Sequence, residues 1–160
     1  MGLRDLIVRK LYSVKNLKKR VNDVNSLYAF CETYKDINGE IDSLPEYIQH
    51  IYKVTCFLAE SMNNSIINFF FSDYHIYKDD LLKSLKYCKM DELIPLYNDA
   101  YTTFGKTEID YGMPLNDFKN SLTTMQKRSL EIYDEDLVKI DGYNHHLYES
   151  LNKFLLSKLE

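Results

Sequence analysis

The amino-acid sequence predicts an all-α protein, a single-domain helical bundle of about seven to eight helices. Three observations favour this class. Apolar residues recur at steps of three and four along the whole chain, which is the spacing of one helix face. No run alternates apolar and polar residues for long enough to require a sheet. The 160 residues, the usual size of one compact domain, include only 5 Gly and 3 Pro, too few for a turn-rich β fold.

The first element is a basic amphipathic helix over residues 1–20. This leader holds seven basic residues against Asp5 alone, a net charge of +6, whereas residues 21–160 form an acidic all-helical domain with a net charge of -10. Two interpretations remain open: its aliphatic residues pack on the bundle, or they lie on an anionic membrane or beside nucleic acid. We favour packing on the bundle, so we expect no membrane contact and no direct nucleic acid binding. The aliphatic residues at helical spacing are Leu3, Leu6, Ile7, Leu11, Val14 and Leu17.

The next three helices have recognisable ends. Asn22 or Asp23 can cap a helix that Asn38-Gly39 terminates. Ser43 and Glu46 match a capping box at the start of a helix over residues 44–62. Residues 63–65 then interrupt the pattern before a short apolar helix over residues 66–70.

The second half of the chain continues in the same way. We expect helices over residues 79–88 and 91–104, with Pro95 tolerated in the first turn of the latter and Gly105 at its exit. Residues 106–116 form the longest loop. One helix resumes near Asp117 and runs beyond residue 130, and a last helix begins near Asn144.

The sequence offers no motif that supports catalysis or cofactor binding. The GxSxG, HExxH and glycine-rich phosphate patterns are absent. His145 and His146 are adjacent, so on a helix they point about 100° apart and cannot both face one metal ion. We therefore expect no enzyme activity, no metal and no cofactor.

Three cysteines, Cys31, Cys56 and Cys88, lie far apart within apolar helical patterns. They fit reduced, buried thiols in a reducing compartment. The N-terminal residues lack the uninterrupted apolar core of a secretion signal. The sequence therefore predicts a cytoplasmic protein.

The segment around the 63–65 break contains the first group of candidate binding residues. Glu60, Asn63 and Asn64 share one face if the helix continues that far. Phe69, Phe70 and Phe71 cannot all point inward from one helix, so at least one of them is expected to line a groove or an interface. The alternative for the two asparagines is purely structural, because they can satisfy the exposed backbone groups of the helix ends.

A second group of candidates is the densest acidic stretch, which suits contact with a basic partner. The candidate binding residues from both groups are Glu60, Asn63, Asn64, Asn68, Phe69, Phe70, Asp134, Glu135, Asp136 and Asp141.

From Leu44 to about Leu155 the chain resembles the bacterial family typified by the nineteen-kilodalton DNA-mimic protein. The resemblance rests on Glu60, on the Asn63-Asn64 pair, and on Asn68 followed by Phe69-Phe70, together with a similar order of helices. Ser65-Ile66 replaces the family's Gly-Gly. The resemblance implies a helical bundle, commonly dimeric, without known catalytic activity, whose typical member mimics duplex DNA to sequester a DNA-binding regulator.

We therefore expect a non-catalytic protein-interaction module that engages a basic protein, such as a DNA-binding regulator, with a homodimer as one arrangement. DNA mimicry is only weakly supported, because a charge of -10 over 140 residues is modest beside that of duplex DNA. Two alternatives remain: an immunity-type protein that neutralises a toxin, and an unrecognised enzyme that uses Glu60, Asn63 and Asn64.

Overall fold

The computed structural model describes residues 2–160, and these residues contain ten α-helices and no β-strand. The all-α prediction is confirmed, but the expected number of helices was too low. The helices are α1 (Leu3–Leu11), α2 (Leu17–Arg20), α3 (Val24–Asn38), α4 (Glu46–Asn63), α5 (Ile66–Phe71), α6 (Leu81–Tyr87), α7 (Ile94–Ala100), α8 (Leu115–Ser121), α9 (Thr124–Asp141) and α10 (His146–Leu159).

Two expected helices are each divided in two, which accounts for the difference. The leader breaks after Leu11, where the side chains of Ser13 and Asn16 both donate to the Lys10 carbonyl. The helix expected from Asp117 onward breaks at Leu122-Thr123, because Thr123 forms a capping box at the start of α9. The Thr123 hydroxyl accepts from the Gln126 backbone N–H at 3.1 Å, and the Gln126 side chain accepts from the Thr123 N–H at 2.9 Å.

The predicted ends of α3 are confirmed, whereas the expected capping box of α4 is wrong. Asp23 caps α3, and Gly39 ends it with a φ of 84°, a conformation that glycine adopts without steric cost. Helix α4 begins at Glu46, after Pro45. Ser43 instead places its hydroxyl 2.6 Å from the Tyr34 hydroxyl.

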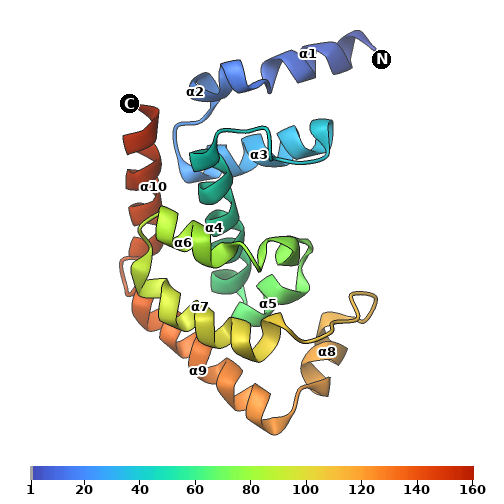
Figure 1. The fold of residues 1–160 in the computed structure, drawn as a ribbon, viewed down its shortest axis with the longest axis vertical. Helices are drawn as coiled ribbons and strands as arrows, with labels where there is room; N and C mark the ends of the chain where they lie inside the picture. The colour runs from blue at the N-terminus through green and yellow to red at the C-terminus, as the bar shows by residue number, and fades with distance from the viewer. Residues whose placement is uncertain (1) are drawn as a thin grey trace.

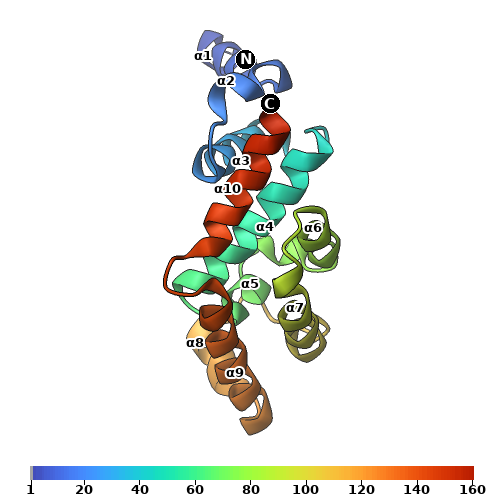
Figure 2. The ribbon, with the colours of Figure 1, turned by 90° about the vertical axis from the view of Figure 1, so that its left-hand side faces the viewer.

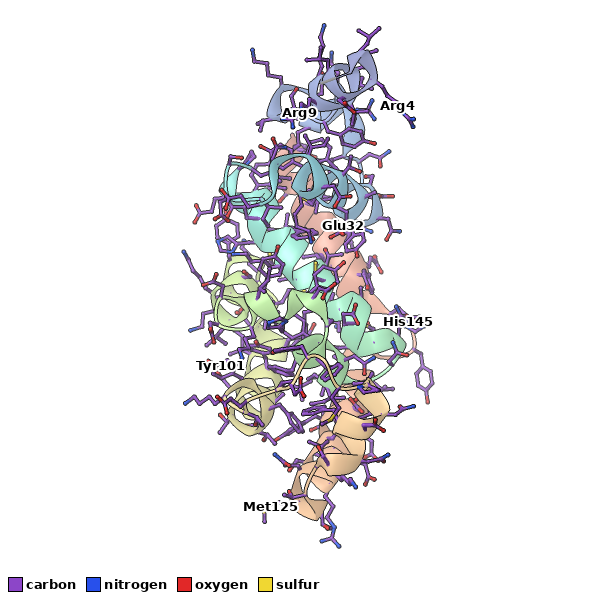
Figure 3. The ribbon with its side chains drawn as sticks, turned by 90° about the vertical axis from the view of Figure 1, so that its right-hand side faces the viewer. Arg4, Arg9, Glu32, Tyr101, Met125 and His145 are labelled. Atoms are coloured by element: carbon purple, nitrogen blue, oxygen red, sulfur yellow. The ribbon has the colours of Figure 1, made fainter. Side chains whose placement is uncertain are left out.

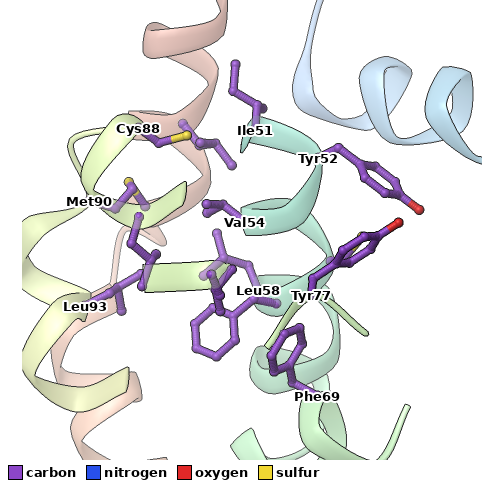
Figure 4. Close-up of a cluster of buried hydrophobic side chains, with 14 of the residues drawn as sticks. Ile51, Tyr52, Val54, Leu58, Phe69, Tyr77, Cys88, Met90 and Leu93 are labelled. Atoms are coloured by element: carbon purple, nitrogen blue, oxygen red, sulfur yellow. The ribbon is translucent and has the colours of Figure 1, made fainter. Parts of the chain in front are cut away.

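Helix α4 is the centre of the molecule. It runs along the long axis antiparallel to α10, and α3, α5 and α6 also pack against it (Figures 1 and 2). It is buried on nearly every side, as expected for a helix enclosed by others. In Figure 4 its residues Ile51, Val54 and Leu58 lie between Met90 and Leu93 on one side and Tyr77 on the other.

The two ends of the elongated molecule are formed by helices other than α4. Helix α9 continues downward from α10, and α8 packs near its far end (Figure 1). At the opposite end α1 and α2 cross above α3. Leu17 of α2 is buried, but α1 has no buried residue at all. The expectation that the aliphatic residues of the leader pack on the bundle is therefore wrong for α1.

Candidate interaction surface

Two of the candidate residues, Asn64 and Asp134, meet at the turn between α4 and α5, where α9 passes close by. Asn64 ends α4, and Asp134 of α9 caps α5 from outside: one carboxylate oxygen accepts from the Ile66 backbone N–H at 2.8 Å and the other from the Ser65 hydroxyl at 2.7 Å. Asp134 thus joins two segments almost 70 residues apart in sequence. Its role in the structure is that of a helix cap, not that of a surface charge.

Asp141 has a similar role at the start of α10. Its buried carboxylate accepts from the Leu147 backbone N–H at 3.2 Å and lies 2.7 Å from Nδ1 of His145. His145 has a φ of 48° and sits in the turn that joins α9 to α10, visible at the edge of the molecule in Figure 3. The Asp141–His145 pair holds this turn against the bundle.

The aromatic part of the motif belongs to the core. Phe69 and Phe70 are fully buried: Phe69 lies edge-on to Phe57 with ring centroids 5.3 Å apart, and Phe70 stacks on Tyr97 at 5.9 Å. Asn68 is buried beside them. The expectation that these three side chains contact a partner is corrected, because α5 is packed between α4 and α9 and turns them inward. Phe71 alone is half-buried, as expected for at least one of the three phenylalanines.

Helix α9 supplies one wall of a cavity of about 150 Å³ under the α9–α10 turn. Ser61 lies in this cavity, and its buried hydroxyl has no hydrogen-bond partner among residues 2–160. The lining residues are Ser61, Met62, Asn64, Asp134, Leu137, Val138, Asp141, Gly142 and His145. Both carboxylates in this cavity, Asp134 and Asp141, already serve as helix caps.

A second hollow, which we call the Glu60 recess, opens between α3, the C-terminal part of α4 and the turn that follows α5. Its volume is about 410 Å³, and it is lined by Glu32, Lys35, Glu60, Phe71, Ser72, Asp73 and Tyr74. The residues come from α3, α4, the end of α5 and the turn that follows. Glu60 is therefore the one candidate from sequence that lines this recess, whereas Asn64 lines the cavity under the α9–α10 turn.

One wall of the Glu60 recess is a polar network around Glu32. Its carboxylate accepts hydrogen bonds from the hydroxyls of Tyr52 and Tyr74 and pairs with the Lys35 ammonium group at 3.4 Å. Lys35 also donates to the Tyr52 hydroxyl at 3.2 Å and lies 5.3 Å from the centre of the Tyr74 ring. Burial raises the pKa of the Tyr52 and Tyr74 hydroxyls, so both remain protonated donors. Glu32 is consequently well satisfied.

Glu60, in contrast to Glu32, has no cationic partner among residues 2–160. Partial burial and, secondarily, the nearby charge of Asp73 raise the pKa of its carboxyl group above the usual value. Neither Glu60 nor Asp73 forms an ion pair with any residue in the described range 2–160. With Glu32, Glu60 and Asp73 against Lys35, the recess has a net charge of -2.

The other candidates remain on the surface. Glu135 and Asp136 point to solvent and lie 4.0 and 3.6 Å from the Lys139 ammonium group. Asn63 is exposed and donates to the Ala59 carbonyl. The enzyme alternative requires Glu60, Asn63 and Asn64 to converge on one site, and the fold does not bring them together.

Sequence reasoning did not identify Glu32, Lys35, Asp73 or Tyr74 as site residues. They lie on two segments, α3 and the turn after α5, and only folding brings these beside Glu60. The surplus of 14 Tyr in the sequence was the available signal, because a buried tyrosine hydroxyl needs a hydrogen-bond partner.

Two kinds of feature are absent from residues 2–160. No group of three or more His, Cys, Asp or Glu is placed to hold a metal ion. No helix in this range is long and apolar enough to cross a membrane.

The protein is thus a small all-helical domain with an acidic, partly aromatic hollow on its surface. Comparison with known proteins adds the family: the model for DMP19-like protein matches residues 42–157. The chain belongs to the DMP19-like protein family, as its resemblance indicated. No curated protein and no solved structure matches it.

Proposed function

We propose that this protein is a non-catalytic interaction module that binds a basic protein, and that the Glu60 recess receives a cationic side chain of that partner. A DNA-binding regulator is the partner class that the family resemblance favours. The observation that carries the proposal is the unpaired carboxylate of Glu60 beside Asp73, in a recess with excess negative charge.

The electrostatics of the recess favour a cation. A carboxyl group with a raised pKa is less stable in its ionised form than the same group in water, because burial and the neighbouring carboxylate both oppose the charge. A guanidinium or ammonium group placed between Glu60 and Asp73 would relieve both effects. Binding would therefore be favoured by an interaction that the free protein lacks.

The aromatic residues in the lining favour arginine over lysine. Phe71 and Tyr74 bring aromatic side chains to the same recess as the carboxylates. A guanidinium group can stack on an aromatic ring while donating to a carboxylate, which an ammonium group does less well.

The experiment compares Glu60→Gln with the wild type in binding an arginine-rich peptide and a lysine-rich peptide of equal charge, by fluorescence anisotropy at low and high salt. We expect the wild type to prefer the arginine peptide and to lose affinity as salt increases. Glu60→Gln should weaken binding about fivefold, the equivalent of about 1 kcal/mol for one partly exposed ion pair.

Glu135→Gln is the matched control, because it removes the same charge from the solvent face of α9. It should bind like the wild type. Glu60→Gln should also be at least as resistant to thermal unfolding as the wild type, because it removes a carboxylate that the fold disfavours. Equal losses of affinity in both variants would contradict the proposal, since they would indicate a general charge effect.

A further inference from the structure

Helix α1 exposes an aliphatic face that nothing in residues 2–160 covers. Leu3 is 75 % exposed, Leu6 49 % and Ile7 50 %, and Leu11 and Val14 are exposed as well. The helix lies at one end of the long axis, outside the core (Figure 1). Figure 3 shows Arg4 projecting from the helix at the same end, whereas Arg9 lies beside a hollow that Tyr34 and Asn38 of α3 also line.

The basic residues of this region also lack acidic partners, although Arg20 lies over the Tyr12 ring. None of the seven forms an ion pair with a carboxylate in the described part of the chain; they are Arg4, Arg9, Lys10, Lys15, Lys18, Lys19 and Arg20. The single acidic residue, Asp5, accepts from the Gly2 backbone N–H at 3.0 Å and so belongs to the start of the helix. The positive charge of the leader is thus not neutralised by the acidic domain.

A nine-residue helix without tertiary burial is only marginally stable in water, because few hydrogen bonds offset the cost of nucleation. A surface that accepts its aliphatic face would stabilise it. That surface must also be anionic, since the helix and the residues after it have an excess of six positive charges.

We infer that residues 3–20 bind the surface of an anionic lipid bilayer. Leu3, Leu6 and Ile7 enter the boundary between headgroups and acyl chains, with α1 parallel to the membrane. Lys10 lies one turn from Leu6 and Ile7, so its methylene chain can cover apolar surface while its ammonium group reaches lipid phosphates. Lys15, Lys18 and Lys19 add electrostatic attraction to the same surface.

The position of α1 agrees with this arrangement. An anionic surface repels the domain of residues 21–160, with its net charge of -10. Because α1 lies at the end of an elongated molecule, it can bind the bilayer while that domain extends into solution. The combination of an apolar face and a polybasic segment is the pair of signals that gives stable attachment.

Co-sedimentation of the full-length protein with lipid vesicles tests the inference. We expect binding to vesicles of phosphatidylcholine mixed with phosphatidylglycerol, weaker binding as salt increases, and little binding to phosphatidylcholine alone. The double variant Leu6→Glu/Ile7→Glu should reduce the partition constant at least about tenfold. Since α1 contributes no core residue, this variant should keep the thermal unfolding of the wild type.

Met125→Glu/Ile132→Glu is the matched control, because it exchanges two exposed aliphatic residues of α9 for the same charges. It should bind vesicles like the wild type. Equal binding to both kinds of vesicle, no binding to either, or equal losses in the two double variants would overturn the inference. So would a dimer in sedimentation velocity without lipid that only Leu6→Glu/Ile7→Glu abolishes, because α1 would then cover a second copy. Glu60→Gln should bind vesicles normally, which separates this test from that of the recess.

Discussion

Carboxylates show how strongly the role of a single residue depends on its surroundings. Asp134 and Asp141 lie in an acidic stretch of sequence, yet both cap helices inside the molecule. Glu135, between them, is solvated. Glu60 is partly buried without a cation, and it alone has the properties expected of a binding group. The residue type predicted a charge in each case, but only the neighbours determine whether that charge is available.

Two histidines should influence stability with opposite signs as the pH falls. Burial lowers the pKa of His50, whose Nδ1 lies 2.8 Å from the Ser84 hydroxyl. Protons then bind the unfolded chain more readily, so its contribution is complete above pH 6.5 and declines as the pH falls below that value. The hydrogen bond to Glu92 raises the pKa of His146, whose contribution is present below 6.5 and is lost as the pH rises.

Urea unfolding at pH 7.5 and pH 5 of the wild type, His50→Gln and His146→Gln measures these contributions. We expect the loss of stability on acidification to be smaller than in the wild type for His50→Gln and larger for His146→Gln. Identical pH dependence in the two variants would show that neither side chain titrates differently in the folded state.

At the scale of the helix, the sequence located elements better than it located their ends. The Thr123 capping box lies within a run that still has helical apolar spacing, so the sequence predicts one helix where the structure has α8 and α9. At α4 the reverse occurred, because a matching Ser43 and Glu46 pair does not form the box. At Thr123 a local capping box sets the boundary, whereas Ser43 lies against the Tyr34 hydroxyl of α3 instead of capping α4.

The capping of α5 from α9 gives a prediction at this scale. Asp134→Ala should destabilise the protein by about 1–3 kcal/mol, because it leaves the Ile66 N–H of a buried helix and the Ser65 hydroxyl without their charged acceptor. Asp136→Ala, two residues further along α9, should change stability by less than about 0.5 kcal/mol, since its pair with Lys139 is exposed. Urea unfolding measures both values. Equal costs would show that the α5 cap contributes nothing.

For the molecule as a whole, the reactivity of the three cysteines can show whether the core opens as one unit. All three are free and buried, as the sequence predicted. Burial raises the pKa of each thiol, to about 12 for Cys88, so the reactive thiolate is scarce as well as inaccessible. The three residues lie on or beside different helices, so their exposure requires the core to open.

We therefore expect native protein at pH 8 to react with iodoacetamide at least about 10³ times more slowly than protein in urea, given the usual stability of a domain this size. Mass spectrometry should find all three thiols modified together as unfolding begins. Rapid modification of one cysteine in the native protein would show that its helix opens independently of the others.

The sequence alone determined the helical class, the approximate positions of most helices, the burial of the cysteines and the family, because all of these follow from the order and spacing of residues along the chain. Tertiary structure alone decided that Phe69 and Phe70 are core residues and that Asp134 and Asp141 are caps. It also decided that α1 remains uncovered and that Glu32, Lys35 and Tyr74 meet Glu60. These outcomes depend on contacts between residues far apart in sequence, and such contacts are set by how helices pack against one another.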